Sequence, residues 1–502
     1  MKFNWFMKFF PLFLFYLALS CLCGCDFTED SKDNVDPNDF NLPVRNQEYD
    51  FLLYNSFYEQ EDDFDNICKE YELQTGVKVK NFSVKSRQDY ISALKFQIES
   101  NDKPSIFVAR NTDELLLWEK EGAALDLSLD LDGDFKDFTK DIDENLLLTS
   151  NDINNFGIPC GIDFSGYFID VRIINDLVGE EKSQQFLEDF RLCSYEEFKN
   201  FVKTFSSYIE IPQRITITLN KTKYELKNEK GDRIRGMTEV FSVRNKPENF
   251  VDSVFSQTFD SPLKFCRASY QQIDFLKDSI ISYLKLLEIE TSYTNKKRGQ
   301  ELSDEMSKET QSNDSLTDFL QGKSLFLQGG NDDLNKVEKI SPGSLKYIRI
   351  LPRKISYPKD DIKSYNSNLS NFNTSFFTFA NSYFIVNSKV SKREQKFAQD
   401  FLIWFNTSKE GKNFIVDRIK KIPAFIKEKA DIGLLGKLFS NYDSKNIFHG
   451  VSFGTPESWR EEISKNQNLK DYFKKSNISN KDCEDIANNI VDSFKNLKKA
   501  GY

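Results

Sequence analysis

The chain has 502 residues, 78 of them acidic and 68 basic, which gives a formal net charge of −10. This length allows two or more lobes, each with a core. An acidic chain without a basic cluster lacks the electrostatic footprint of a nucleic-acid-binding protein, so we expect no nucleic acid as partner. The single histidine, His449, argues against a multi-histidine metal site and against histidine acid–base catalysis.

Residues 1–24 have the pattern of a secretory signal. Lys2 and Lys8 give a positively charged start, and residues 9–22 are almost wholly apolar. This apolar run is shorter than the roughly 20 residues that a membrane-spanning helix needs. It fits the apolar region of a signal peptide. The run ends in Leu-Cys-Gly-Cys, which resembles the bacterial lipobox, so we expect cleavage before Cys25 and lipidation of that residue.

Alternatives for this segment stay open. Cys21 is a weaker candidate for the lipidated residue, and the segment could also be cut by the general signal peptidase or remain an uncleaved anchor. Residues 25–46 carry many acids and few apolar side chains, which predicts an acidic flexible tether. The expected location is therefore extracytoplasmic, with a lipid anchor to the cell membrane on the periplasmic face or the outer surface.

From residue 47 the pattern alternates between strands and helices. Gly76 stands where a helix would end in the left-handed conformation. Ser86-Arg-Gln-Asp89 matches a capping box, which begins a helix. Apolar runs predict strands and amphipathic stripes predict helices, with strands at 51–54, 77–79 and 106–108 and helical stripes over 64–71 and 90–98. This alternation predicts an α/β lobe with a mainly parallel sheet.

Polar residues follow two of these strands directly. In parallel sheets, ligands bind beyond the carboxyl ends of the strands. Asn55 and Ser56 follow the first strand, and Arg110 and Asn111 follow the third. We regard these four residues as candidate ligand contacts; ordinary turn chemistry is the alternative for Asn55, Ser56 and Asn111.

Six segments, in chain order over roughly residues 48–428, resemble the family 1 extracellular solute-binding proteins, the maltodextrin-binding class. Two positions depart from the family pattern: Ser105 replaces a usual aspartate, and Asn331 or Asp332 stands where an aromatic residue is common. The segments are YELQTGVKVKNFSV, QIESNDKPSIFVAR, WEKEGAALDLS, NNFGIPCGIDFSGYFID, FLQGKSLFLQGGNDD and FANSYFIVNSKVSKREQKFAQDFLIWFNTSKEGKNFI.

The resemblance implies an α/β, two-lobed periplasmic-binding-protein-like fold of type II, in which crossing hinge strands join the lobes and the ligand lies between them. It places crossings near Ile158 to Asp163, Ile348 to Pro352 and Ile422 to Ala424. The first lobe would comprise 47–162 and 353–420, and the second 163–352 and 421–502. It further implies capture by hinge closure, without catalysis or cofactor.

The resemblance also implies which residues hold a sugar. Asp163 aligns with an acidic residue that bonds ring hydroxyls at the first crossing in sugar-binding relatives; the alternative is a structural hinge carboxylate or cap. Gly330 and Asn331 fall where relatives present backbone and an aromatic side chain. Tyr167 could stack on a ring, although its strand position favours the core, and Trp459 lies where relatives often contribute a cleft aromatic residue.

Arg110 could bind an acidic sugar or pair with an acid at the rim. Cys68, Cys160, Cys193, Cys266 and Cys483 are expected to be mostly small buried residues, with one disulfide left open. Residues 211–250 match no family segment, and Gly231 among charges suggests the turn of an inserted β-ribbon in the second lobe. The segment over 476–501 predicts an amphipathic helix packed on that lobe, with lysines in its last turn.

Enzyme motifs fail on inspection. Residues 450–454 match GxSxG, but His449 precedes the serine, whereas that hydrolase fold needs a histidine after it. No metal site follows from the sequence. Two functions remain: a lipid-anchored, monomeric binding protein that delivers a sugar or oligosaccharide to ABC permease subunits, or a surface lipoprotein on the same scaffold that acts as a ligand sensor or adhesin.

Overall fold

The computed structural model places most of the chain from residue 49 onward. Cys25, Asn111, Trp459, Cys266 and the proposed leader and tether lie outside the described residues. The described residues are 49–110, 112–129, 133–142, 146–149, 155–211, 213–227, 231–242, 254, 257–259, 269, 271–294, 311–356, 369, 372–375, 377–425, 435–439, 448–449, 461–463 and 465–499.

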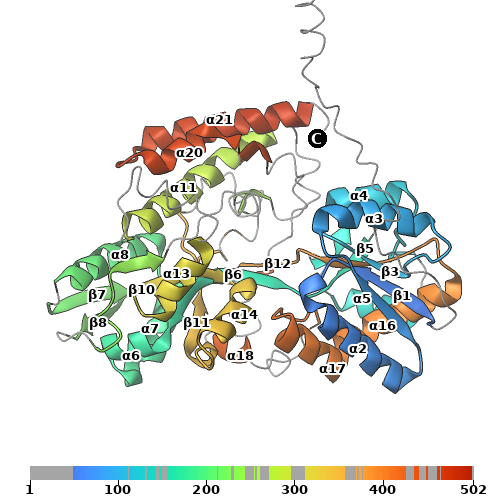
Figure 1. Ribbon diagram of the computed structural model, residues 1–502. Helices are drawn as coiled ribbons and strands as arrows, with labels where there is room; N and C mark the ends of the chain where they lie inside the picture. The colour runs from blue at the N-terminus through green and yellow to red at the C-terminus, as the bar shows by residue number, and fades with distance from the viewer. Residues whose placement is uncertain are drawn as a thin grey trace, which may run out of the picture.

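The first lobe is built on a six-stranded sheet with helices on both faces (Figure 1). In spatial order its strands are β2 (Val79–Ser83), β1 (Phe51–Asn55), β3 (Ile106–Ala109), β13 (Tyr383–Val386), β5 (Asn155–Pro159) and β4 (Leu148–Thr149). β1 pairs in parallel with both β2 and β3, whereas β13 is antiparallel to β3 and β5. The predicted α/β lobe is thus confirmed, but its sheet is mixed and not mainly parallel, because β13 and β4 add antiparallel pairs to it.

Helices of the first lobe follow the expected stripes. Their bounds are η1 (Tyr58–Gln60), α2 (Glu61–Thr75), α3 (Arg87–Glu99), α4 (Thr112–Lys120), α5 (Gly133–Lys140), α16 (Lys392–Thr407), α17 (Lys409–Asn413) and the π-helical turn η6 (Phe414–Arg418). On α2 the residues Phe64, Ile67, Cys68 and Tyr71 are all buried, as their spacing predicts. Gly76 ends this helix in the left-handed conformation, with φ 76°.

The second lobe contains a mixed sheet centred on the long strand β6 (Asp163–Asp170). Its strand order is β14 (Phe448–His449), β12 (Phe377–Phe379), β6, β10 (Ser324–Gly330) and β9 (Glu239–Ser242), and β11 (Ile348–Leu351) also pairs with β6. β12 pairs with residues 163–165 of β6, and β11 pairs with residues 167–170 of the same strand. Both of these pairings are antiparallel, as is that of β10 with β6.

Helices pack around this sheet. They are α6 (Val171–Val178), α7 (Glu180–Leu192), α8 (Tyr195–Glu210), η3 (Gln272–Phe275), α11 (Leu276–Ser292), α13 (Gln311–Leu320), α14 (Asn331–Ile340), η4 (Leu345–Tyr347), α18 (Leu435–Leu438), α20 (Gln467–Lys474) and α21 (Asn480–Lys499). Of these helices, α11, α20 and α21 form a further helical layer of the second lobe. Figure 1 shows α20 and α21 lying along α11, at the top of this lobe in the view. The expected C-terminal helix is confirmed: Ile486, Ile490 and Phe494 are buried on one face of α21, in a core shared with α11.

The expected β-ribbon exists, but its turn lies elsewhere than at Gly231. The hairpin consists of β7 (Ile215–Leu219) and β8 (Thr222–Leu226), and Asn220 and Lys221 form its turn with φ of 46° and 67°. Two consecutive positive φ values are typical of the two-residue turn that matches strand twist. Gly231 instead packs against Asp176, where an added Cβ would lie 2.6 Å from the Asp176 Cβ.

Three segments connect the two sheets. Residues 160–162 lead from β5 to β6, residues 380–382 lead from β12 to β13, and the third segment returns near Ile422. Ile162 and Ile422 exchange two backbone hydrogen bonds, of 2.7 and 2.9 Å. The crossing expected near Ile348 to Pro352 differs from this arrangement, because β11 and β12 both pair with β6 in the second sheet. The first lobe therefore regains the chain after residue 379 and not after residue 352.

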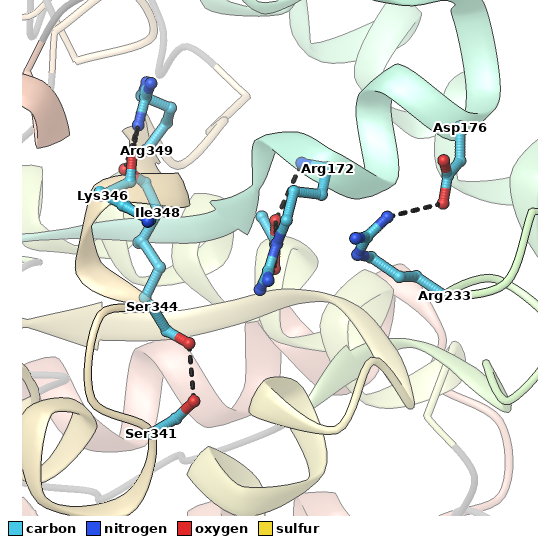
Figure 2. Close-up of polar contacts among 9 residues, drawn as sticks. Arg172, Asp176, Arg233, Ser341, Ser344, Lys346, Ile348 and Arg349 are labelled. Atoms are coloured by element: carbon cyan, nitrogen blue, oxygen red, sulfur yellow. Dashed lines mark hydrogen bonds and ion pairs between the residues drawn. The ribbon is translucent and has the colours of Figure 1, made fainter.

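Charged and hydroxyl side chains make local contacts near the start of α6 and of β11 (Figure 2). Arg172, on α6, pairs with Asp170, the last residue of β6. The Arg172 guanidinium also lies 4.3 Å from the Tyr347 ring centre. Arg233 pairs with Asp176 at 3.3 Å. Arg349 donates through Nη1 to the carbonyl oxygens of Lys346 and Ile348, and the Ser341 and Ser344 hydroxyls lie 2.6 Å apart. These contacts account for the local structure, and we assign no ligand to them.

Candidate functional site

A buried polar cluster lies at the three crossings. Asp163, the first residue of β6, is 1% exposed. Its Oδ2 accepts a hydrogen bond from the Lys421 ammonium at 2.9 Å, and its Oδ1 accepts one from Asn331 Nδ2 at 2.5 Å. Lys421 also donates to Asn381 Oδ1 at 2.8 Å and to Ser382 Oγ at 3.4 Å. One ammonium, carried by the third connecting segment, therefore bonds residues at the other two.

Charge balance explains why this cluster can be buried. Burial raises the pKa of the Asp163 carboxyl, whereas the Lys421 ammonium and the Asn331 amide favour its ionised form. Both carboxylate oxygens have donors within the protein, as the structural alternative for Asp163 would require, and its contact with a ligand stays a prediction.

Two glycines are needed for close approach at this hinge. Gly161 has φ 148°, and a Cβ there would lie 2.8 Å from the Lys421 Cβ. Gly330 precedes α14, and a Cβ there would lie 2.7 Å from the carbonyl oxygen of Phe164. Gly330 donates its N–H to Asp333 Oδ2 at 3.1 Å, which fixes the start of the helix that presents Asn331. The predicted Gly330 and Asn331 thus lie beside Asp163.

A small pocket opens in the second lobe next to this hinge. Its volume is about 40 Å³, which is room for about three water molecules. Ser165 lines it from β6, two residues beyond Asp163 on the same face of the strand. The other lining residues are Gln257, Tyr283, Leu286, Arg353, Ile355, Phe372 and Ser375. The wall thus combines hydroxyl groups, an amide, a guanidinium and two aromatic rings.

Arg353 is the charged residue among those that line the pocket, and Glu290, which is not a lining residue, pairs with it. The guanidinium binds the carboxylate through Nε at 3.1 Å and through Nη2 at 2.9 Å to both oxygens. Tyr167 donates its hydroxyl to Glu290 Oε1 at 2.5 Å. The predicted Tyr167 therefore lies in the core with 0% exposure, and burial together with the Glu290 carboxylate raises its pKa.

The sequence predictions missed this pocket. Tyr283, Leu286 and Glu290 have the i, i+3, i+7 spacing that places side chains on one face of α11, so a signal was present. The stripe has the same spacing as an ordinary core face, and Arg353 comes from a segment that follows β11. Sequence spacing alone could not bring Arg353 to that helix face.

At the first lobe, the predicted Asn55 has a structural role. Its side chain is 0% exposed, donates to Asn81 Oδ1 at 2.7 Å, and accepts from Ser83 Oγ at 2.9 Å and from the Phe57 backbone N–H at 2.8 Å. These bonds join the ends of β1 and β2 and shape the loop that follows. Ser56 lies in that loop, half-buried.

The same edge presents an exposed aromatic ring that the sequence predictions missed. Tyr58, in η1 after β1, is 41% exposed, and the Lys85 ammonium lies 5.3 Å from its ring centre. The predicted Arg110 follows β3 and binds Glu114 through its backbone N–H at 2.9 Å and Nε at 3.0 Å. Arg110 therefore has the ion-pair partner that the sequence left as its alternative, while the Tyr58 ring is partly exposed to solvent.

Membrane-spanning helices, metal-ligating groups and disulfides are the remaining features to consider in the described residues. No helix in the described part of the chain is both long and apolar enough to cross a membrane. Among the same residues, no group of three or more histidine, cysteine, aspartate or glutamate side chains could hold a metal ion. Cys68, Cys160, Cys193 and Cys483 are buried and carry no disulfide.

Two α/β lobes joined by three crossing segments define the type II solute-binding class. Structural comparison supports this: a family 1 extracellular solute-binding protein from Bifidobacterium longum subsp. infantis gives a TM-score of 0.56 at 17% identity, over 88% of this chain and 98% of that one. A Streptococcus pneumoniae solute-binding protein in complex with the blood group A-trisaccharide gives 0.53 at 16% identity, over 89% and 99%. The GacH receptor of Streptomyces glaucescens, which was solved unliganded and with acarbose, gives 0.51 at 12% identity, over 89% and 98%.

The sequence profile of the bacterial extracellular solute-binding protein family matches residues 66–425. The chain therefore belongs to this family, which confirms the resemblance and the two-lobed fold. Members are extracytoplasmic binding proteins without catalytic activity. Comparison with the curated proteins gives no match.

Proposed function

We propose that the chain captures a sugar or oligosaccharide between its lobes and delivers it to the permease of an ABC importer. The second-lobe pocket carries this proposal. Hydroxyls of Ser165 and Ser375 and the N–H groups of Arg353 suit ring hydroxyls, and the rings of Tyr283 and Phe372 suit the apolar face of a sugar. The sugar-bound state of structural neighbours is consistent with this chemistry.

The first lobe contributes the other half of the site in this proposal. Tyr58 stacks on one ring of the ligand, and Ser56 at the same strand ends offers a hydroxyl. The pocket of about 40 Å³ takes only part of a sugar, so an oligosaccharide would extend from it toward the first lobe. In this proposal the lobes close around such a ligand by rotation about the connecting segments, which Lys421 joins to one another.

A calorimetric screen of neutral and acidic oligosaccharides tests this function. We expect at least one to bind with a dissociation constant in the micromolar range or below, and small-angle scattering of the saturated protein to show a smaller radius of gyration. Binding requires both lobes, so closure is favoured only when the ligand contacts each of them. Absence of binding across the panel would reject the proposal, and saturation without compaction would reject closure.

Matched variants locate the ligand on the first lobe. Tyr58→Ala should weaken binding of the same oligosaccharide about 2- to 10-fold, because stacking on an aromatic ring contributes about 0.5–1.5 kcal/mol. Phe96→Ala on α3 is the control, since Phe96 is 42% exposed, close to the 41% of Tyr58, but lies away from the strand ends. Equal effects of the two variants would place the ligand elsewhere.

The proposed anchor is a lipid on Cys25. The apolar run that ends in Leu-Cys-Gly-Cys supports it, since this arrangement directs lipidation in bacterial secretory signals. Mass spectrometry of the mature protein from its native membrane should find an acylated N-terminal Cys25. The Cys25→Ala chain should be released from the membrane fraction. An unmodified N-terminus at another residue would contradict the anchor without affecting the binding proposal.

A further inference from the structure

We propose that the second-lobe pocket selects uncharged hydroxyl-bearing groups, because Glu290 cancels the charge of Arg353 inside its wall. The inference rests on the proposed function and narrows the ligand to neutral sugars. Arg353 is the cation among the described lining residues, and its pairing with Glu290 determines both the charge of the pocket and the donors that a ligand can reach.

The ion pair with Glu290 neutralises the charge of Arg353 but does not use all of its N–H donors. Its side chain is 13% exposed and that of Glu290 4%, so little solvent screens the pair. Nε and Nη2 bind the two carboxylate oxygens at 2.9–3.1 Å. A guanidinium carries five N–H donors, and those on Nη1 take no part in this pair. Arg353 also forms a side-chain hydrogen bond with Tyr283, which uses part of its remaining donor capacity but adds no charge. The pocket therefore holds hydrogen-bond donors without net charge.

The other described residues of the wall are uncharged. Ser165 and Ser375 provide hydroxyls, Gln257 an amide, and Tyr283 a phenol, while Leu286, Ile355 and Phe372 are apolar. The Arg353 guanidinium lies 5.3 Å from the Tyr283 ring centre, which holds it against the aromatic wall. A ligand carboxylate or ammonium in this pocket would lose its hydration and find no countercharge, whereas a hydroxyl finds donors and acceptors.

Paired glycans test this selection. Neutral oligosaccharides ending in glucose or galactose are titrated beside the same compounds oxidised at C6 to the uronic acid. For the wild-type protein we expect each neutral member to bind at least 10-fold more tightly than its uronic acid. In Glu290→Gln, Arg353 regains its net charge, so the preference should fall about 10-fold or reverse. Glu288→Gln is the control, because Glu288 lies two residues earlier on α11 and, among the described contacts, it is Glu290 that pairs with Arg353; this variant should keep the wild-type preference.

The outcomes separate the two proposals. Equal or tighter binding of uronic acids by the wild-type protein overturns the charge selection and leaves carbohydrate binding in place. An unchanged preference in a folded Glu290→Gln variant also overturns it. If that variant fails to fold, as a thermal melt would show, the wild-type ratio decides alone. Absence of binding by every glycan, neutral or acidic, rejects the proposed function and this inference with it.

Discussion

Lys421→Met is expected to lower the free energy of unfolding by about 3–5 kcal/mol, the usual cost of leaving one partner of a buried ion pair without the other. The side chains of Lys421 and Asp163 are 9% and 2% exposed. Removing the ammonium leaves the Asp163 carboxylate with the Asn331 amide as its described donor, and it also removes the bonds to Asn381 and Ser382. The three crossings then lose their common contact.

Urea unfolding followed by tryptophan fluorescence measures this loss. The neighbouring Lys420→Met is the control, because Lys420 pairs with Glu338 at 3.2 Å and that carboxylate stays hydrated at 40% exposure. We expect Lys420→Met to cost about 1 kcal/mol or less. The double variant Asp163→Asn/Lys421→Met should recover part of the loss, since no uncompensated charge is left buried. Equal effects of the two single lysine variants would contradict a special role for Lys421.

The first lobe was predictable because its signals are local. The stripe over Phe64–Tyr71 on α2 and the left-handed Gly76 at its end are both properties of a short segment, and both are confirmed. The Ser86 hydroxyl accepts from the Asp89 N–H at 3.4 Å, as the capping box predicts. In each case the residues that determine the structure lie within one or two turns of one another.

The second crossing was not predictable in the same way. The segment 348–352 has the pattern of a strand, and a strand is what it forms as β11. The pattern does not predict which strand it pairs with, and in the structure the partner is the C-terminal half of β6, residues 167–170. Residues 377–379 form a second short strand beside the near half of β6, which carries the crossing to 380–382. Pairing partners of this kind are set by tertiary packing and not by local sequence.

The same reason explains the candidate site. Asp163 and Asn331 were both singled out from their places in family segments, and the structure brings them into contact. Lys421 is separated from Asp163 by 258 residues, and Arg353 from Glu290 by 63. Neither pair leaves a pattern in the sequence, because each side chain alone reads as an ordinary charged residue. Folding alone creates the ion pairs that hold the hinge and set the charge of the pocket.

Lys354 provides a prediction for pH. It is 0% exposed, and its ammonium donates to the carbonyl oxygen of Arg191 at 2.7 Å and to that of Asn373. Arg191 lies in the last turn of α7, where helix carbonyls favour a cation. Asn373 bonds both the N–H and the carbonyl of Ile355, so this lysine helps to fix the chain that carries Phe372 and Ser375 into the pocket wall.

The burial of this ammonium determines the direction of the pH effect. Burial lowers the pKa of Lys354 from 10.5 to about 8, against the opposing effect of the Cys193 and Glu197 side chains and with a contribution from Arg191 in the same direction. In the unfolded chain the lysine keeps its usual pKa near 10.4. Between these two pKa values the unfolded state binds more protons than the folded state, so stability rises with pH over this interval. Below about pH 8 both states are protonated and the full cost of burial is present.

The free energy of unfolding of the wild-type protein, relative to Lys354→Met, should therefore increase by about 2 kcal/mol between about pH 7 and pH 9.5, as follows from the linkage of these pKa values. Urea unfolding of both proteins over this range measures the difference, in which the titration of all other groups cancels. Lys223→Met is the matched control, because Lys223 lies on β8 with its side chain exposed, and its difference from wild type should be flat over the same interval. Parallel curves for wild type and Lys354→Met would mean that Lys354 keeps the same proton affinity in both states. The ammonium would then be hydrated in the folded protein, and the segment around Asn373 would be held by the Ile355 bonds and Arg191 without it.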